Sequence, residues 1–309
     1  MANWKSLGPR DGLIIGSTTG KVPLWEPDYL KYCKNSAKGK SKKYYPQVSL
    51  LDDYASHFNF RGFKLILSSA CTASTQALGL AYRLLKSKKL DRCLIGGHEV
   101  LSELTCRGFE SLGLISSNRS RPFDSKRDGI NLSEGNAFLC LERFSNQLES
   151  NPIGEIKAYH CSTDAYHMTS PHPEGLSLLA SIRYAMKEAK LREEDISWIH
   201  AHGTGSIHND LAEGKAFYHF FQKNTIVTST KGYHGHTLGA SGAIEVIISL
   251  MALNENVILP TLGLIDPDPE IPLSFLPEAS SIMDGRVKNI LKTTSGFGGC
   301  NAALVLSGV

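Results

Sequence analysis

Residues 64–87 read KLILSSACTASTQALGLAYRLLKS and combine a strand, a tight turn and a helix. The apolar run 65–67 has strand character, and small residues follow it up to Cys71. Beyond Cys71, apolar side chains recur at spacings of three and four, which is typical of an amphipathic helix. These side chains are Ala77, Leu78, Ala81, Leu84 and Leu85. The stretch therefore predicts a cysteine between a strand and the first turn of a helix.

The position of Cys71 allows two interpretations. Unpaired backbone N–H groups and the positive end of a helix dipole can stabilise a thiolate and hold an oxyanion, which suits a covalent nucleophile. Cysteine is also among the most buried residue types, so a single cysteine at such a turn is more often part of a core. Other parts of the sequence have to decide between a nucleophile and a core residue.

The composition is that of a globular protein without a strong charge. The chain has 309 residues, of which 41% are hydrophobic and 20% charged, and its net charge is +3. This length suits one large domain or two fused halves, and the charge is too small to indicate nucleic-acid binding. The basic cluster 38–43, KGKSKK, contains a glycine and a serine, which favours a solvated loop over a patch for nucleic acid or an acidic protein.

The cysteines indicate a reducing compartment. There are seven, with no CxxC pair and no metal-type spacing against the eleven histidines. An odd number in apolar runs predicts free thiols and a cytoplasmic protein. The N-terminus has no apolar signal core, and no stretch reaches the roughly 18 apolar residues of a membrane span. We therefore expect no metal site and no membrane span.

Strands and helices alternate along the chain. Alternation at these lengths predicts an α/β protein with mixed or parallel sheets. Residues 21–60 are expected to be helical in part, and a polar break at 145–152 predicts two halves, 1–150 and 151–309. Strands are predicted at 12–16, 65–67, 92–95, 136–142, 153–162, 196–201, 226–229, 290–294 and 302–306. Helices are predicted after Cys71 and at 175–190, 210–221 and 242–254.

Three motifs of the second half can supply partners for Cys71. Residues 200–206 read HAHGTGS at a strand end, and residues 231–245 read KGYHGHTLGASGAIE between a strand and a helix. The glycine-rich 294–303, TSGFGGCNAA, can turn backbone N–H groups into a site. Taken singly, each histidine is more often structural and each glycine turn can be simple packing. Together with Cys71 they form the Cys–His pattern of acyl transfer.

At this point the sequence resembles the β-ketoacyl-acyl-carrier-protein synthases of the thiolase superfamily, of the elongating type with a Cys-His-His site. The motifs occur in the family's order along nearly the whole chain. They are SSACTAS (68–74), RPFDSKRDGINLSEG (121–135), HGTGS (202–206), KGYHGHTLGASGAIE (231–245) and GFGGCNAAL (296–304). The resemblance implies a layered αβαβα fold of two similar halves with mixed sheets.

The resemblance also implies a reaction. An acyl chain passes from a carrier-protein thioester to Cys71, malonyl-carrier protein loses carbon dioxide, and the enolate attacks the acyl-enzyme. His202 and His236 would stabilise the enolate as neutral Nε2–H donors, and the N–H groups of Cys71 and Phe297 would form a second oxyanion hole. Such enzymes act in fatty acid, polyene or polyketide synthesis. No cofactor or metal is implied.

Other residues receive supporting roles from the same resemblance. Lys231 would be a cation held by Glu245, and Phe297 would gate the site between acylation and condensation. The residues Asp210 and Glu213 are expected to cap or pair structurally. Ion pairs are expected to hold the loop that contains Arg121, Asp124, Arg127, Asp128 and Glu134. The implied partners are acyl- and malonyl-loaded acyl carrier protein, in a homodimer or a heterodimer with a related subunit.

The sequence departs from the family pattern in several places. It is short at the N-terminus, so the half 1–150 is expected to lack the first strand and helices of the family, which a partner subunit could supply. His234 adds a third imidazole, residues 207–209 read IHN, and Cys300 stands where threonine is usual. Two other functions stay open: a non-catalytic, chain-length-type partner subunit, and a degradative thiolase for which Cys300 would be the second cysteine.

Overall fold

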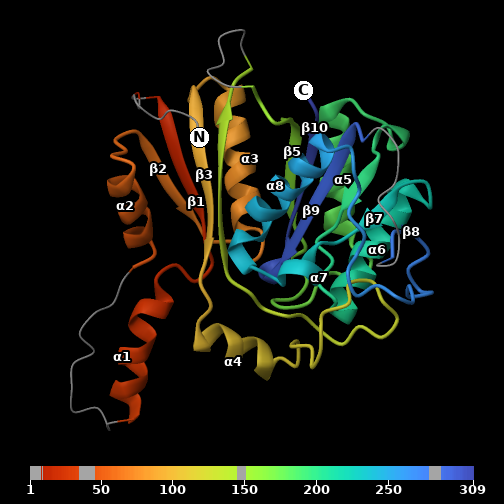
Figure 1. The fold of residues 1–309 in the computed structure, drawn as a ribbon, viewed down its shortest axis with the longest axis horizontal. Helices are drawn as coiled ribbons and strands as arrows, with labels where there is room; N and C mark the ends of the chain where they lie inside the picture. The colour runs from red at the N-terminus through yellow and green to blue at the C-terminus, as the bar shows by residue number, and fades with distance from the viewer. Residues whose placement is uncertain (1–7, 9, 35–45, 145–150, 278–286) are drawn as a thin grey trace.

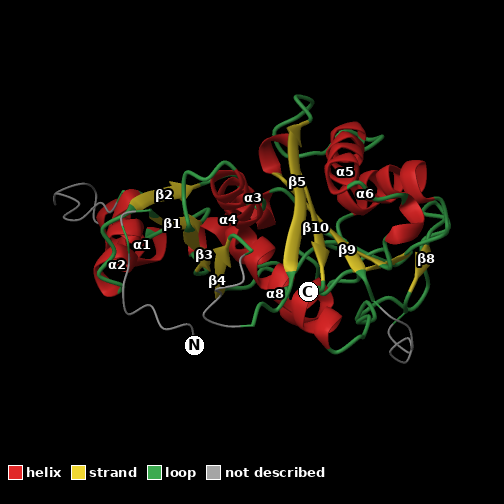
Figure 2. Cartoon of the chain, turned by 90° about the horizontal axis from the view of Figure 1, so that it is seen from above, coloured by secondary structure: helices red, strands yellow, loops and turns green. Residues whose placement is uncertain are grey.

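Two β-sheets lie side by side, with helices between them and against their outer faces (Figures 1 and 2). They are seen in a computed structural model that describes residues 8, 10–34, 46–144, 151–277 and 287–309. The basic cluster 38–43 and most of the expected break at 145–152 lie outside these residues. The helices and sheets stack as α, β, α, β and α layers, which confirms the predicted fold class.

The first sheet has the strand order β2-β1-β3-β4. The first three strands are parallel, and β4 runs antiparallel to β3. Every residue of β1 is buried, as expected for a central strand covered on both faces. The bounds are β1 Asp11–Gly16, β2 Phe63–Leu67, β3 Arg92–Glu99 and β4 Gly135–Glu142.

The second sheet has the order β5-β10-β9-β6-β7-β8. Its β9, β6, β7 and β8 are parallel, whereas β10 is antiparallel to both β5 and β9. Both sheets are therefore mixed. The bounds are β5 Glu155–Thr163, β6 Trp198–His200, β7 Ile226–Thr228, β8 Ser274–Phe275, β9 Asn289–Gly296 and β10 Cys300–Ser307.

The helices α3 and α8 lie between the sheets, α2 covers the first sheet, and α5 and α6 cover the second (Figure 1). The predicted helices are all present. Helices α4 and α7 and strand β8 were not predicted, and β6 is shorter than expected. The bounds are α1 Val22–Lys34, α2 Val48–His57, α3 Ala73–Lys86, α4 Glu103–Ser111, α5 Leu176–Ala189, α6 Ile207–Phe221, α7 Lys231–His234 and α8 Ser241–Asn254.

One hydrophobic core extends through both sheets and the helices between them. It contains Leu78 of α3, Ile95 of β3, Tyr159 of β5 and Val246 of α8, all of them buried. Gly79 of α3 lies so close to the Tyr159 ring that a Cβ there would stand 2.1 Å from it. The two sheets are thus joined by tight packing.

Glu99, at the end of β3, forms a second connection between distant segments. Its side chain is buried and accepts hydrogen bonds from the backbone N–H groups of Thr18 and Thr19, each at 2.8 Å. It also accepts one from the N–H of Gly239 at 2.9 Å. Because buried carboxylates are stable only when hydrogen-bonded, Glu99 needs donors from both parts of the chain.

In the segment 121–135, carboxylates bind backbone N–H groups, and the expected ion pairs are found at Arg127. Asp124, for example, accepts from the N–H groups of Lys126, Ile265 and Asp266. Among the described residues, Arg127 is the member of the five that forms ion pairs, with Asp210 and Asp268. The carboxylates bind the backbone because an irregular loop leaves its own N–H groups unpaired.

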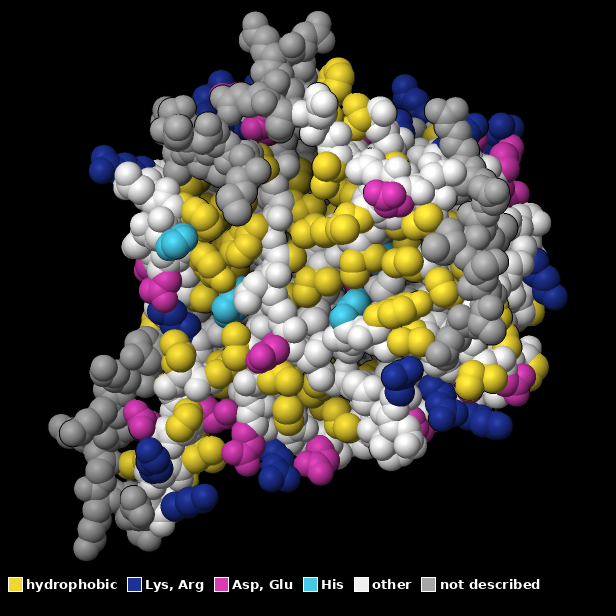
Figure 3. Space-filling view, viewed as in Figure 1, with side chains coloured by type: hydrophobic (Ala, Val, Ile, Leu, Met, Phe, Trp, Pro, Cys, Tyr) yellow, Lys and Arg dark blue, Asp and Glu magenta, His cyan; other side chains and the backbone are white. Residues whose placement is uncertain are grey.

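Apolar side chains gather around α8 on the face drawn in Figure 3. In α8, Met251 is 60% exposed, while Ile244 and Ile247 are partly buried against the core. Nevertheless, none of the helices in the described ranges has the length and hydropathy to cross a lipid bilayer.

Candidate active site

Cys71 lies in a sharp turn between β2 and α3. The preceding Ala70 has a left-handed backbone with φ of +47°, and Thr72 Oγ1 donates to the carbonyl of Ser69 at 2.7 Å. Two glycines make room for this turn. A Cβ at Gly16 would stand 2.4 Å from the N of Ser74, and one at Gly296 would stand 3.1 Å from the N of Cys71. The turn holds Cys71 two residues before the helix, as predicted.

The thiol of Cys71 is surrounded by hydrogen-bonding groups. Nε2 of His236 is 3.0 Å from Sγ, and the backbone N–H groups of Phe297 and of Cys71 itself also contact the sulfur. Burial nevertheless raises the pKa of Cys71 to about 12, although Lys231 and the two N–H groups act to lower it. The resting thiol is therefore protonated, because burial outweighs the helix N-terminus that we expected to favour a thiolate.

His202 follows β6 in a loop whose backbone is bound by two carboxyl groups of α6. Glu213 accepts hydrogen bonds from the N–H groups of His202 at 2.6 Å and Gly203 at 2.8 Å. Asp210 accepts in the same way from Thr204 at 3.0 Å. Burial raises the pKa of both carboxyl groups, and both bind backbone N–H groups of the loop. Their role is structural, as predicted from the sequence.

Lys231 is buried at the start of α7 and fixes the orientation of His202. Its ammonium group contacts Glu245, the carbonyl of His202 at 2.6 Å and Nδ1 of His202 at 3.2 Å. An ammonium group has three hydrogens and no acceptor, so it can only donate to Nδ1. His202 is therefore the tautomer that carries its proton on Nε2.

His236 lies across from His202, with ring centres 5.1 Å apart and planes at 82°. Burial, followed by the charge of Lys231, lowers the pKa of both histidines well below the ordinary value, so both rings are neutral. Nδ1 of His236 is 3.0 Å from the hydroxyl of Ser241. A hydroxyl can donate or accept, and His236 can therefore adopt either tautomer.

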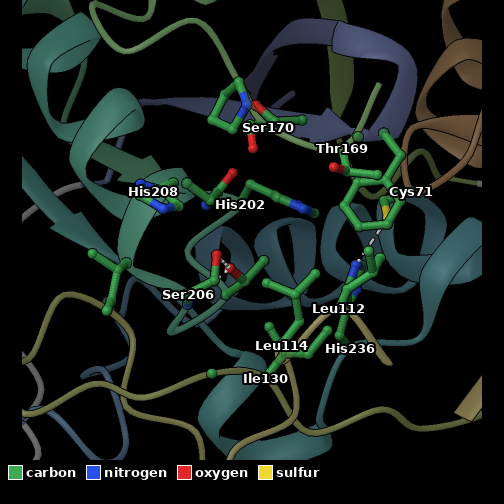
Figure 4. A pocket seen from close by; sticks show the side chains of 18 of the residues that line it. Cys71, Leu112, Leu114, Ile130, Thr169, Ser170, His202, Ser206, His208 and His236 are labelled. Atoms are coloured by element: carbon green, nitrogen blue, oxygen red, sulfur yellow. Dashed lines mark hydrogen bonds between the residues drawn. The ribbon is translucent and has the colours of Figure 1, made fainter. Parts of the chain in front are cut away.

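Figure 4 shows Cys71, His202 and His236 directed into one space. Sγ of Cys71 and one ring nitrogen from each histidine, the atoms that could bind a metal, all lie within 4.8 Å of one another, which is close enough to hold a metal ion. Metal binding would require an unprotonated Nε2 on His202. Since Lys231 donates to Nδ1 of that ring and keeps Nε2 protonated, the arrangement suits hydrogen-bond donation and proton transfer better than metal coordination.

The three residues lie in a cavity of about 360 Å³. Phe297 also lines it, and its ring stacks on that of Phe109 of α4 at 5.2 Å and 14°. Two backbone hydrogen bonds fix the glycines after Phe297. The N–H of Gly298 donates to the carbonyl of Met168 at 2.7 Å, and the N–H of Asp164 donates to the carbonyl of Gly299 at 2.8 Å. Other lining residues include Leu112, Leu114, Ile130, Thr169, Ser170, Ser206 and His208 (Figure 4).

Two family models match this chain. They are "Beta-ketoacyl synthase, N-terminal domain" over residues 6–147 and "Beta-ketoacyl synthase, C-terminal domain" over residues 153–264. The 3-oxoacyl-[acyl-carrier-protein] synthase 2 of Coxiella burnetii is 32% identical over 97% of this chain and 76% of its own. The chain belongs to the beta-ketoacyl synthase family. It is accordingly a condensing enzyme of the acyltransferase class.

Solved beta-ketoacyl synthases have the same fold. The ishigamide ketosynthase/chain length factor is 26% identical, with a TM-score of 0.90 over 99% of this chain and 77% of that one. A type II polyketide synthase ketosynthase, bound to a hexaketide and in complex with its acyl-carrier protein, is 25% identical with a TM-score of 0.87. That match covers 97% of this chain and 78% of the other.

The structure brings most of the predicted site residues of this beta-ketoacyl synthase together. Cys71, His202, His236 and Phe297 line the cavity, and Lys231 and Glu245 form a buried pair behind it. The third imidazole, His234, bonds instead to the hydroxyl of Thr230. Within the described part of the chain the cavity lining does not include Cys300.

Two residues near the site were missed. Phe109 belongs to α4, a helix whose sequence carried no recognised motif. Lys292 lies in the middle of β9 with its side chain fully buried, and its Nζ is 2.7 Å from Glu245. A lysine directly after the apolar Ile290 and Leu291 could have served as a signal, because a buried charge requires a partner.

Proposed function

We propose that this enzyme carries an acyl chain on Cys71 and condenses it with a malonyl unit. The observation that carries the proposal is the Cys71 sulfur, which lies in the cavity 3.0 Å from Nε2 of His236 and next to the N–H groups of Cys71 and Phe297. A thiol beside a neutral imidazole and two oxyanion donors can accept and release an acyl group.

In the first half-reaction, the sulfur of Cys71 attacks the carbonyl carbon of an acyl thioester. Nε2 of His236 accepts the thiol proton, which its resting contact with the protonated thiol prepares it to do. The N–H groups of Cys71 and Phe297 bind the oxyanion. The bond to the donor thiol then breaks, and that thiol leaves with the proton from His236.

In the second half-reaction, a malonyl thioester loses carbon dioxide and becomes an enolate. Nε2–H of His202, fixed by Lys231, donates to the enolate oxygen, and His236 joins it after it changes to the Nε2–H tautomer. The enolate carbon attacks the acyl carbon on Cys71. The carbon–sulfur bond of the acyl-enzyme breaks, and the released thiolate takes up one proton.

We propose acyl carrier protein as the bearer of both thioesters. The support comes from the complex of a ketosynthase with its acyl-carrier protein, and from relatives named for acyl-carrier protein. The ishigamide ketosynthase/chain length factor supports a dimer with a like or related subunit. A cytoplasmic location and a division into halves 1–150 and 151–309 belong to the same proposal.

Intact-mass spectrometry of the protein with a series of acyl-carrier proteins tests this function. We expect the mass to increase by one acyl group in the wild type and not in Cys71→Ala, and β-ketoacyl product to form once malonyl-acyl-carrier protein is added. An acyl adduct that survives in Cys71→Ala would overturn the assignment. No adduct, with or without a related subunit, would favour the chain-length-type partner instead.

A further inference from the structure

Two lysines share one buried carboxylate behind His202. Lys231 and Lys292 both contact Glu245, Lys292 at 2.7 Å, and all three side chains are at most 2% exposed. Burial raises the pKa of Glu245, but the two ammonium groups outweigh it and hold that pKa well below its usual range. Burial lowers the pKa of Lys292 and Glu245 acts against this shift; with both ammonium groups protonated, the cluster of Lys231, Glu245 and Lys292 carries one positive charge in excess.

The second lysine is costly and needs a reason. One ammonium group would already neutralise Glu245, and burying another costs free energy unless it is well paired. Lys292 donates to the carbonyl of Thr293 and lies 3.5 Å from the carbonyl of Ala201, directly before His202. Lys292 thus contacts both Glu245, which binds Lys231, and the carbonyl of Ala201, the residue before His202.

Titratable groups face this cluster from every neighbouring element. These groups are His200 and His202 on or after β6, Glu213 on α6, His234 on α7 and His236 before α8. The imidazoles are neutral because burial lowers their pKa values. The carboxylate of Glu213 accepts hydrogen bonds from two backbone N–H groups and from the hydroxyl of Thr293. Among the described residues, Glu245 is the carboxylate that forms ion pairs with both lysines, and Glu213 acts on Lys292 through its charge without an ion pair.

We propose that Lys292 is a positioning residue for decarboxylation: through Glu245 it fixes Lys231 against His202, and it adds positive charge behind the imidazole that faces the enolate. This inference rests on the proposed function and assigns Lys292 mainly to one half-reaction. Acyl transfer to Cys71 depends on His236 and the two backbone N–H groups. Lys292 also lowers the pKa of His236, but above the acidic limb, where that ring is neutral with or without Lys292, acyl transfer does not require it.

The variant Lys292→Met removes the charge and keeps a long unbranched side chain. We expect malonyl decarboxylation to slow by roughly tenfold, because a unit charge so close in a protein interior acts strongly on developing charge. Acylation of Cys71, followed by intact mass, should stay within about twofold. The acidic limb of the decarboxylation rate should move to higher pH, since the charge of Lys292 lowers the pKa of His202.

The double variant Lys292→Met/Glu245→Gln separates charge from packing. It leaves Lys231 as the single excess charge, so the acidic limb should return toward its wild-type position. A purely structural role predicts instead that the double variant is more damaged than the single one in both half-reactions. If circular dichroism shows that Lys292→Met does not fold, Lys292→Gln, which keeps an N–H donor for the Thr293 carbonyl, takes its place; a folded Lys292→Met that has lost acylation would contradict the proposal.

The two proposals fail in different ways. If the wild type neither accepts an acyl group nor decarboxylates malonyl-acyl-carrier protein, the proposed function is wrong. If the wild type does both, and Lys292→Met decarboxylates at the wild-type rate with an unmoved acidic limb, the role of Lys292 is wrong while the proposed function stands.

Discussion

His202 and His236 face the same cavity, yet their neighbours give them different freedom. Lys231 can only donate to Nδ1 of His202 and so holds that ring in one tautomer. The hydroxyl of Ser241 can donate to His236 or accept from it. His202 is therefore suited to a fixed hydrogen bond, whereas His236 is suited to moving a proton to and from Cys71.

Replacing His202 by alanine should separate the half-reactions. We expect malonyl decarboxylation to fall by about 10²–10³-fold, the usual loss when one oxyanion donor is removed. Acyl transfer to Cys71 should continue. Radiolabelled carbon dioxide release and intact mass report the two steps. The matched control is His234→Ala, whose ring bonds to Thr230, and equal losses in the two variants would contradict the assignment.

The protonation of Cys71 predicts how the thiol reacts with iodoacetamide. With a pKa of about 12, the thiolate fraction should rise tenfold per pH unit up to at least pH 10. Labelling of Cys71, measured by peptide mass, should therefore increase without a plateau over pH 6–10. The exposed Cys33 provides an internal comparison for the reagent. A plateau near neutral pH for Cys71 would show a thiolate instead.

At the scale of elements, the amphipathic helix α3 and the motifs around it could be predicted from the sequence, because the residues that are apolar in the local pattern are also buried in the fold. Leu78 and Ala81 recur at helical spacing and are buried. The Lys231–Glu245 pair was also foreseen. Lys292 was not, because its partner comes from a helix far along the chain, and only folding brings the two together. Phe109 was missed for a similar reason, since its stacking on Phe297 is a tertiary contact.

Gly16 at the end of β1 is required for the turn that holds Cys71. In Gly16→Ala the new Cβ would press on the backbone of Ser74, and such overpacking costs about 1–3 kcal/mol. We expect a lower midpoint in urea unfolding and slower acylation. Gly108→Ala in α4 is the control, because open space surrounds that position and alanine favours a helix. Equal stability of the two variants would contradict this account.

The stacked rings of Phe109 and Phe297 predict a coupled gate. Removing the partner in Phe109→Ala should free Phe297 and raise malonyl decarboxylation without an acyl chain by about 2–10-fold, the worth of one aromatic pair. Carbon dioxide release without acyl donor measures this. Leu112→Ala changes another lining residue without ring stacking, and a matching increase there would assign the effect to cavity size.

At the scale of the whole molecule, the shared core predicts one cooperative unfolding transition. Trp198 of β6 and Cys93 of β3 belong to the same buried cluster although they lie in different sheets. In a chain with Trp4 and Trp25 replaced by phenylalanine, Trp198 fluorescence and Cys93 labelling should give coincident urea curves. Two separated midpoints would show that the halves unfold independently.

Glu99 has a consequence for how the protein is made. Its carboxylate takes donors from Thr18 and Thr19 and a further one from Gly239, which lies 140 residues later in the chain. On the ribosome the earlier segment emerges first, and its carboxylate stays one donor short until Gly239 has been synthesised. The hydrogen bonds around Glu99 are therefore completed only after residue 239 has left the ribosome, so until then the nascent chain carries a carboxylate that still lacks one of its final donors.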